Sequence, residues 1–379
     1  MGQSKMGTRP VAAFFHFILY AGFIIINIEV LEILIDGLAG THRIFSIAGP
    51  VYDLLIALFE LLAFAVLVAC VVFLARRNVL HLKRFTMREM TSWPRSDANI
   101  ILVTEILLMS AFLMMNASDH LLQEMGADHY VQAGSFPVSN LLLPLMNGWS
   151  YEALIFTERF CWWFHIIGIL AFLNYIPYSK HFHIVLAFPN TWYSKLTAAG
   201  EISNMDHVTR EVKMMLDPSI QPENAEPSRF GASDVTDLTW KQLMDAYSCT
   251  ECGRCTSSCP ANITGKLLSP RKIMMDTRDR LEEVGRNLNK NNGKLVDDGK
   301  TLLNDYIKPE ELWACTSCNA CVEACPVLID PLSIIIDMRR YLVMEKSAAP
   351  QELNGMFTRI ENNGAPWKFS PADRMNWTE

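Results

Sequence analysis

The chain has 379 residues, half of them hydrophobic, and its mean hydropathy is +0.15. A positive mean is unusual for a soluble protein of this size, so the composition indicates a membrane portion. The formal net charge of −7 provides no basic surface for nucleic acid, and no nucleic-acid partner is expected. Ten cysteines in so long a chain, most of them in two tight runs, indicate metal binding rather than disulfides.

Four apolar stretches approach the length of about 20 residues that crosses a bilayer. They cover residues 11–35, 51–75, 100–116 and 153–176. The segment between the second and third stretches is rich in basic residues, which favours the cytoplasmic side. These residues are Arg76, Arg77, Lys83, Arg84, Arg88 and Arg95. We therefore expect a multi-pass protein of the inner, cytoplasmic membrane of a prokaryote, with both termini and the cysteine-rich domain in the cytoplasm.

The predicted fold is mainly α-helical, with an N-terminal four-helix transmembrane bundle and a C-terminal α-helical ferredoxin-type dicluster domain. We expect a cytochrome b-like membrane domain over residues 1–188 and a linker with one short helix over 189–237. The cysteine-rich domain should follow over 238–345, and an irregular tail over 346–379. Within the cysteine-rich domain, residues 270–285 and 300–307 are predicted to be helical.

Eight cysteines form two runs, at residues 249–260 and 315–326, each with the spacing C-x2-C-x2-C-x3-C-P. Three closely spaced thiolates can bind one [4Fe–4S] cluster, while the fourth, followed by proline, reaches the other cluster. A pair of zinc sites is the alternative, but zinc usually takes two C-x2-C pairs, which this spacing fits badly. The crossed assignment gives cluster one Cys249, Cys252, Cys255 and Cys325, and it gives cluster two Cys315, Cys318, Cys321 and Cys259.

Histidines in the apolar half are candidates for haem ligands. His165 and His183 are eighteen residues apart, so one continuous helix would place them on the same face, about 27 Å apart along its axis. That spacing suits one haem b near each membrane face. His16, near the cytoplasmic start of the first stretch, is the expected partner of His183, and one haem b is expected there. His165 leaves a second haem or a packing role open, with His120 as its only candidate partner. His181 is rotated by about 200° from His183 and is not expected to share its role.

Four acids lie in the predicted spans: Glu29, Glu32, Glu60 and Glu105. Acids there are costly and are functional candidates. Glu60 and Glu105 are the candidates for carrying protons to or from a quinone. Glu29 and Glu32 lie near the outer end of their span, where water or an arginine is an equally good explanation. No motif locates a quinone pocket.

The segment Tyr175-Ile176-Pro177-Tyr178-Ser179-Lys180-His181-Phe182-His183, with His165 before it, resembles the last span of the nitrate reductase gamma-subunit family. In that family this helix supplies one axial ligand to each of two b haems. His16, followed by Gly22-Phe23, resembles the helix that supplies the partners. The family's partner helix carries a second histidine about three turns further on, where this chain reads Ile24-Ile25-Ile26-Asn27.

The cysteine-rich half is similar to the iron–sulfur subunit of heterodisulfide reductases and related quinone-linked oxidoreductases. The likeness is carried by Trp313-Ala314-Cys315, Cys325-Pro326-Val327, Asp330-Pro331 and the stretch from Glu361 to Trp367. Many relatives continue into a module with Cys-Cys-Gly repeats, which does not occur in this sequence. The resemblance therefore implies a separate cytoplasmic catalytic subunit with Cys-Cys-Gly modules.

These patterns predict a membrane-bound electron-transfer subunit of a quinone-linked oxidoreductase. It would pass electrons between the quinone pool, haem b, two [4Fe–4S] clusters and a cytoplasmic partner subunit. The alternative is a haem-free membrane anchor that tethers a dicluster ferredoxin to another redox enzyme. A third interpretation is a redox-sensing interaction protein without a role in turnover.

Overall fold

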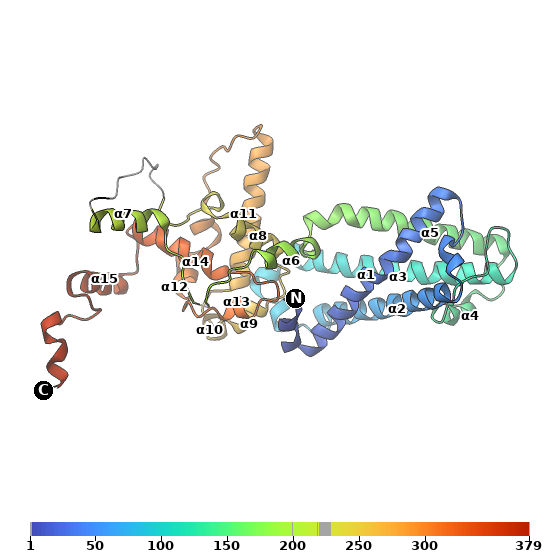
Figure 1. The fold of residues 1–379 in the computed structure, drawn as a ribbon, viewed down its shortest axis with the longest axis horizontal. Coiled ribbons are helices and arrows are strands. Elements are labelled where there is room, and N and C mark those ends of the chain that lie inside the picture. Colours follow the sequence, from blue (N-terminus) through green and yellow to red (C-terminus); the bar gives the residue numbers. More distant parts are fainter. Residues whose placement is uncertain (1, 199, 218, 220–228, 379) are drawn as a thin grey trace. The chain divides into compact units, whose positions relative to one another are not determined.

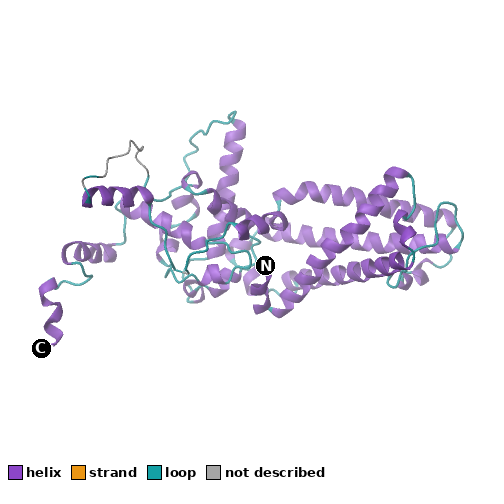
Figure 2. Ribbon diagram, in the orientation of Figure 1, coloured by secondary structure: helices purple, strands orange, loops and turns teal. Residues whose placement is uncertain are grey.

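The computed structural model describes residues 2–198, 200–217, 219 and 229–378. In this part of the chain the regular elements are helices joined by loops, and there is no strand, as Figure 2 shows. The described residues fall into two compact units. The first unit comprises Met1–Trp192, Tyr247–Gly253 and Cys325–Leu328, and the second comprises Tyr193–Ala246, Arg254–Ala324 and Ile329–Glu379. The prediction of a mainly α-helical protein is confirmed.

Four long helices build the first unit, and each is long and apolar enough to cross a membrane. Helix α1 packs on α2, α2 on α3, and α3 on α5 (Figure 1). The four predicted spans therefore correspond to four helices, the third of them much longer than expected. The bounds are α1, Pro10–Ala39; α2, Pro50–Asn78; α3, Trp93–Glu124; and α5, Tyr151–Tyr175, with the short α4 at Leu143–Met146.

Apolar side chains cover both the inner and the outer faces of these helices. Phe59 and Phe112 are buried in the core, whereas Phe17 and Phe156 are more than half exposed. Such an outer surface is unusual in water but expected where lipid surrounds the helices. A Cβ atom on Gly168 would lie 2.7 Å from a Leu108 methyl group, so α3 and α5 approach as closely as they do because residue 168 is glycine.

The prediction that one continuous helix carries both His165 and His183 is wrong. Helix α5 ends at Tyr175, and two short 3-10 turns, Ile176–Tyr178 and Lys180–Phe182, precede α6 (His183–Trp192). Pro177 lies in the first of these turns, where its missing N–H and the clash of its ring with the carbonyl four residues earlier disfavour a regular α-helix. His165 and His183 therefore lie on different helices, and their axial spacing cannot be read from residue count.

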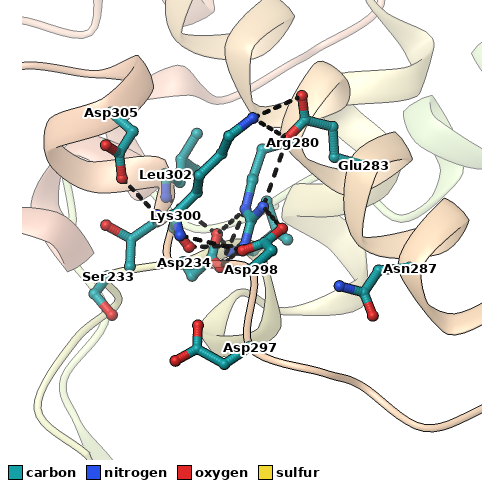
Figure 3. A network of polar contacts seen from close by, with 12 residues as sticks. Ser233, Asp234, Arg280, Glu283, Asn287, Asp297, Asp298, Lys300, Leu302 and Asp305 are labelled. Carbon is teal, nitrogen blue, oxygen red and sulfur yellow. Dashed lines mark hydrogen bonds and ion pairs between the residues drawn. The ribbon is translucent and has the colours of Figure 1, made fainter. Parts of the chain in front are cut away.

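Shorter helices make up the cysteine-rich part. These are α7 (Asp206–Leu216), α8 (Trp240–Ser248), α9 (Arg254–Ser258), α10 (Pro260–Ile263), α11 (Pro270–Lys290), α12 (Pro309–Trp313), α13 (Ala320–Glu323), α14 (Pro331–Arg340) and α15 (Gln351–Asn363). Helix α11 confirms the predicted helix that starts at residue 270; Ser269 caps it by accepting a hydrogen bond from the Lys272 N–H. Near the middle of α11, Arg280 is the centre of a network of acids (Figure 3).

Three details of this part differ from expectation. Residues 300–307 contain only one irregular turn, because Leu303 is extended and Asn304 has φ +80°. The tail is not wholly irregular, since it contains α15. The expected linker over 189–237 contains the end of α6 and the whole of α7, and its residues 199, 218 and 220–228 lie outside the described part of the chain.

Candidate metal centres

The two cysteine runs have the same backbone pattern. In the first run, Glu251 and Gly253 have φ of +55° and +71°, and α9 follows at once. In the second run, Ser317 and Asn319 occupy the corresponding positions with φ of +55° and +58°, and α13 follows. Alternating left-handed residues turn successive N–H groups to one side, a geometry that suits anionic sulfides and thiolates. The sequence repeat is therefore also a repeat of local structure.

The four cysteines predicted for cluster two lie close together in the second unit. Burial first, and also the neighbouring Cys315 and Cys259 thiols, raise the pKa of the Cys321 thiol to about 12. Burial also raises the pKa of Cys315, with added contributions from Cys259 and Cys318. Helix α9, just before Cys259, packs on α13, which carries Cys321. The last cysteine of the first run thus lies beside the first three of the second run, as the crossed assignment requires.

Three of the four cysteines predicted for cluster one belong to the first unit: Cys249 and Cys252 from the first run and Cys325 from the second. The crossed assignment likewise groups Cys325 with the first run. Among the described residues, no three His, Cys, Asp or Glu side chains are placed to hold a single metal ion. A cubane binds each thiolate to a different iron, so its ligands stand further apart than those of one zinc ion.

Arg339 of α14 is a residue that sequence reasoning missed. Its guanidinium donates hydrogen bonds to the carbonyl oxygens of Leu312 at 2.6 Å and of Cys315 at 2.5 Å. It also lies over the Trp313 ring, 5.1 Å from the centroid. Burial lowers the pKa of Arg339, and the Cys315 thiolate opposes this effect. A cation therefore fixes the start of the second run, although no sequence spacing pointed to it.

Polar contacts inside the first unit join the segment after α5 to the loops of both cysteine runs. Lys180 forms an ion pair with Glu251, which lies between Cys249 and Cys252. Ten residues later, the buried Asn190 donates a hydrogen bond to the carbonyl oxygen of Val327 at 2.9 Å.

Three histidines meet near the start of α6. The His181 and His183 rings are 5.6 Å apart, and His16 of α1 is close enough to act electrostatically on both. Burial first, and then the charges of His181 and His16, lower the pKa of His183 to about 3. The structure therefore places His16 near His183, and their role as a pair of haem ligands stays a prediction. It also brings His181 to the same place, which the helical-wheel argument excluded because it assumed an unbroken helix.

The ring orientation of His183 follows from one hydrogen bond. Its Nδ1 lies 3.0 Å from the carbonyl oxygen of Lys180. A carbonyl can only accept, so Nδ1 carries the proton and the Nε2 lone pair of the neutral ring is available. An imidazole that ligates a metal usually shows this arrangement.

His165 has a similar arrangement deeper in the bundle. It is 1% exposed, its Nδ1 lies 3.2 Å from the carbonyl oxygen of Leu108, and its Nε2 has no hydrogen-bond partner. His120 is not brought to it. His120 lies twelve residues beyond Leu108 on α3, about 18 Å along the axis, where it contacts Glu124 and Phe136. The expected candidate partner of His165 is therefore in the wrong place.

The two proton candidates lie in different surroundings. Glu60 is fully buried and accepts hydrogen bonds from Asn116 at 3.2 Å, from the Val138 and Ser139 N–H groups at 2.9 and 3.1 Å, and from the Ser139 hydroxyl. These bonds indicate a structural role for Glu60, which holds the loop that follows α3. Glu105 is only partly buried, on α3.

Comparison with known proteins identifies the class of the cysteine-rich part. Residues 248–329 match the family model described as a 4Fe-4S dicluster domain. The chain thus contains an iron–sulfur electron-transfer domain, and its curated relatives are iron–sulfur proteins. No solved structure matches the chain.

Three curated relatives are informative. The whole chain is 28% identical to the probable iron-sulfur-binding oxidoreductase FadF of Bacillus subtilis, covering 54% of that protein. It is 26% identical, again along its whole length, to the EtfAB:quinone oxidoreductase of Syntrophomonas wolfei, covering 52% of it. About a third of the chain (32%) is 35% identical to one subunit of the ferredoxin/F(420)H(2)-dependent CoB-CoM heterodisulfide reductase of Methanosarcina acetivorans, covering 60% of that subunit.

The chain thus spans about half the length of the first two relatives. The expected likeness to heterodisulfide reductases is confirmed for the iron–sulfur part. The likeness of the membrane half to nitrate reductase gamma subunits stays a prediction.

Proposed function

We propose that this chain carries electrons between a membrane quinone and a cytoplasmic partner oxidoreductase, through a haem b and two [4Fe–4S] clusters. The dicluster domain and four helices able to span a membrane support this role. Quinone is proposed as the membrane substrate because a relative along the whole chain is named an EtfAB:quinone oxidoreductase. The proposed orientation places both termini and the clusters in the cytoplasm, on the side of the basic segment between α2 and α3.

The observation that carries the haem proposal is the pairing of His16 with His183. His183 donates through Nδ1 to a backbone carbonyl, which leaves Nε2 available as an axial ligand. Burial holds its ring in the neutral form that can bind iron. A bound haem would accept and release one electron at a time. This chain would hold the haem through His16 and His183, and His181 would lie beside it.

A second haem at His165 extends the same proposal. Its Nε2 is buried without a hydrogen-bond partner, which suits a ligand. No histidine opposite it is identified in the described residues, so His165 would need a different second ligand.

The proposed clusters use the crossed cysteine sets. Cluster one is assigned to Cys249, Cys252, Cys255 and Cys325, and cluster two to Cys315, Cys318, Cys321 and Cys259. The partner is proposed to be a catalytic subunit with Cys-Cys-Gly modules, because the likeness to a heterodisulfide reductase lies in the iron–sulfur part.

The test is an oxidised-minus-reduced optical spectrum, with pyridine haemochrome quantification, of the detergent-purified, cluster-loaded protein. We expect a b-type signal that is lost in His16→Ala and His183→Ala and kept in the exposed control His129→Ala. Loss in His181→Ala with retention in His183→Ala would move the ligand to His181. Absence of haem from fully cluster-loaded protein would leave the alternative, a haem-free anchor for a dicluster ferredoxin.

A further inference from the structure

Lys180 is a buried cation just beyond the last membrane-spanning helix. Its side chain is 9% exposed, and its ammonium group contacts three oxygen atoms. It donates to the carbonyl oxygen of Pro94 at 2.5 Å, forms an ion pair with Glu251, and lies 3.8 Å from Asp97. A buried lysine with such partners is fixed in place, because moving it would take a positive charge away from two buried carboxylates.

Asp97 of α3 fixes the backbone around this lysine. Its carboxylate accepts a hydrogen bond from the Tyr175 hydroxyl at 2.5 Å and another from the Lys180 N–H at 3.1 Å. Tyr175 is the last residue of α5, so Asp97 binds both sides of the break between α5 and α6. The segment that presents Lys180 and His183 is therefore held to α3 by its own backbone.

Glu251 connects this segment to the predicted ligands of cluster one. It is 2% exposed and lies between Cys249 and Cys252, in the left-handed conformation described above. The hydrogen bond from Asn190 to Val327 makes a second connection, two residues after Cys325. Residues 180–190, which include His183, thus contact both loops that carry cysteines assigned to cluster one. All of these residues belong to the first unit.

We propose that Lys180 is a positioning residue for cluster one, which it holds beside the His183 segment through Glu251. Cluster one would then be the cluster that exchanges electrons with the redox centre of the membrane part. This proposal deepens the proposed function. It rests on that function for the order of the redox centres between the membrane quinone and the partner subunit. Cluster two, fixed by Arg339, would then face the partner.

The charge of Lys180 gives this proposal a measurable signature. The potential of an iron–sulfur cluster depends on the net charge and hydrogen bonds around it. Removing the ammonium group takes one positive charge away from the Glu251 carboxylate and makes the surroundings of the cysteine loop more negative. That negative charge disfavours addition of an electron, so the potential of cluster one falls. Removing the Glu251 carboxylate instead should raise the potential of cluster one.

The experiment is an EPR-monitored redox titration of both clusters in the detergent-purified holoprotein. We expect the potential of cluster one to fall in Lys180→Gln, to rise in Glu251→Gln, and to return toward the original value in Lys180→Arg and in the double variant. Cluster two should keep its potential throughout. Lys272→Gln is the matched control, since Lys272 is also ion-paired but with Asp276 and Glu311, outside both runs.

The outcomes separate the possible roles. Shifts of equal sign in Lys180→Gln and Glu251→Gln, or no shift in either, would overturn the proposal, because a merely structural pair has no reason to give opposite signs. A shift in the potential of cluster two alone would also overturn the proposal, because Lys180 would then act on cluster two and not on cluster one. The titration needs no haem and no quinone. Its result therefore does not depend on whether the proposed function is correct.

Discussion

Arg43 donates two hydrogen bonds to the same carboxylate oxygen of Asp119, from Nε at 2.8 Å and from Nη2 at 2.7 Å. Arg43 lies between α1 and α2, and both side chains are buried. Burial lowers the pKa of Arg43, but the surrounding acids, Asp119 first, raise it well above its usual value. Its Nη1 also lies 3.5 Å from Glu29. One cation therefore compensates two buried acids at this end of the bundle.

Replacing Arg43 by methionine should strongly destabilise the first unit. The methionine preserves much of the volume but removes the guanidinium charge that faces Asp119 and Glu29, at a cost of roughly 3–5 kcal/mol. The free energy of unfolding can be measured by denaturant titration in mixed micelles. Arg95→Met is the control, because Arg95 is exposed and the change should stay within about 0.5 kcal/mol. Equal effects of the two substitutions would contradict the structural role of Arg43.

The two proton candidates should separate into a structural and a functional residue. Glu60→Gln replaces an acceptor of several hydrogen bonds by a group that also donates, so we expect a loss of stability of about 1–3 kcal/mol. Glu105→Gln should leave stability unchanged and slow quinol-driven reduction of the clusters roughly 100-fold, as loss of a proton-transfer group does. Unfolding and stopped-flow measurements on both variants test this. Unchanged reduction rates in Glu105→Gln would remove it from the proton route.

The crossed assignment predicts which cluster each fourth cysteine supports. In Cys259→Ser, cluster two should be lost or altered while cluster one keeps its EPR signal and potential. Cys325→Ser should give the reverse result. Mössbauer and EPR spectra of the reduced, reconstituted protein distinguish the two signals. An uncrossed arrangement would show itself as damage to cluster one in Cys259→Ser, since each run would then serve its own cluster.

The membrane helices were predictable from hydropathy, but their lengths were not. The third span was expected over residues 100–116, whereas α3 runs from Trp93 to Glu124. Polar residues at both of its ends made it look shorter. The Asp97 carboxylate accepts hydrogen bonds from Tyr175 and Lys180, and the Asp119 carboxylate accepts two from Arg43. Hydropathy cannot show that a distant partner compensates a charge, so it ends a helix where the charges begin.

In the candidate sites, too, local sequence patterns were predictive and contacts between residues distant in sequence were not predicted. The cysteine spacing predicted a repeat that the backbone reproduces, because metal-binding loops are local structures. The position of His181 was misjudged because helical geometry was extended across Pro177. Sequence reasoning also missed the polar role of His42, whose Nε2 lies 3.0 Å from Asp119. Arg339 and Lys180 act through contacts with residues far away in sequence, which no local pattern reveals.

Arg280 of α11 provides the last test, within the cysteine-rich part of the chain (Figure 3). Its guanidinium is 4% exposed and binds Asp234 at 2.8 Å, Asp298 at 2.6 Å and the carbonyl oxygen of Lys300 at 2.8 Å. Asp234 in turn accepts a hydrogen bond from the Leu302 N–H at 3.1 Å. The side chains of these acids and the Lys300 carbonyl therefore tie two loops, distant in sequence, to α11.

Arg280→Met should destabilise this part of the chain by an amount near the lower end of roughly 3–5 kcal/mol, since Asp298 is partly exposed and water can screen it. Lys300→Met is the matched control: its ammonium pairs with the partly exposed Glu283, so its removal should cost less than about 1 kcal/mol, while its carbonyl still accepts from Arg280. The readout is the temperature at which the cluster absorbance is lost on heating. A much earlier loss in Arg280→Met than in Lys300→Met is expected, because the loops that Arg280 fixes lead into α12 and the second cysteine run. Identical temperatures would show that the network does not support cluster retention.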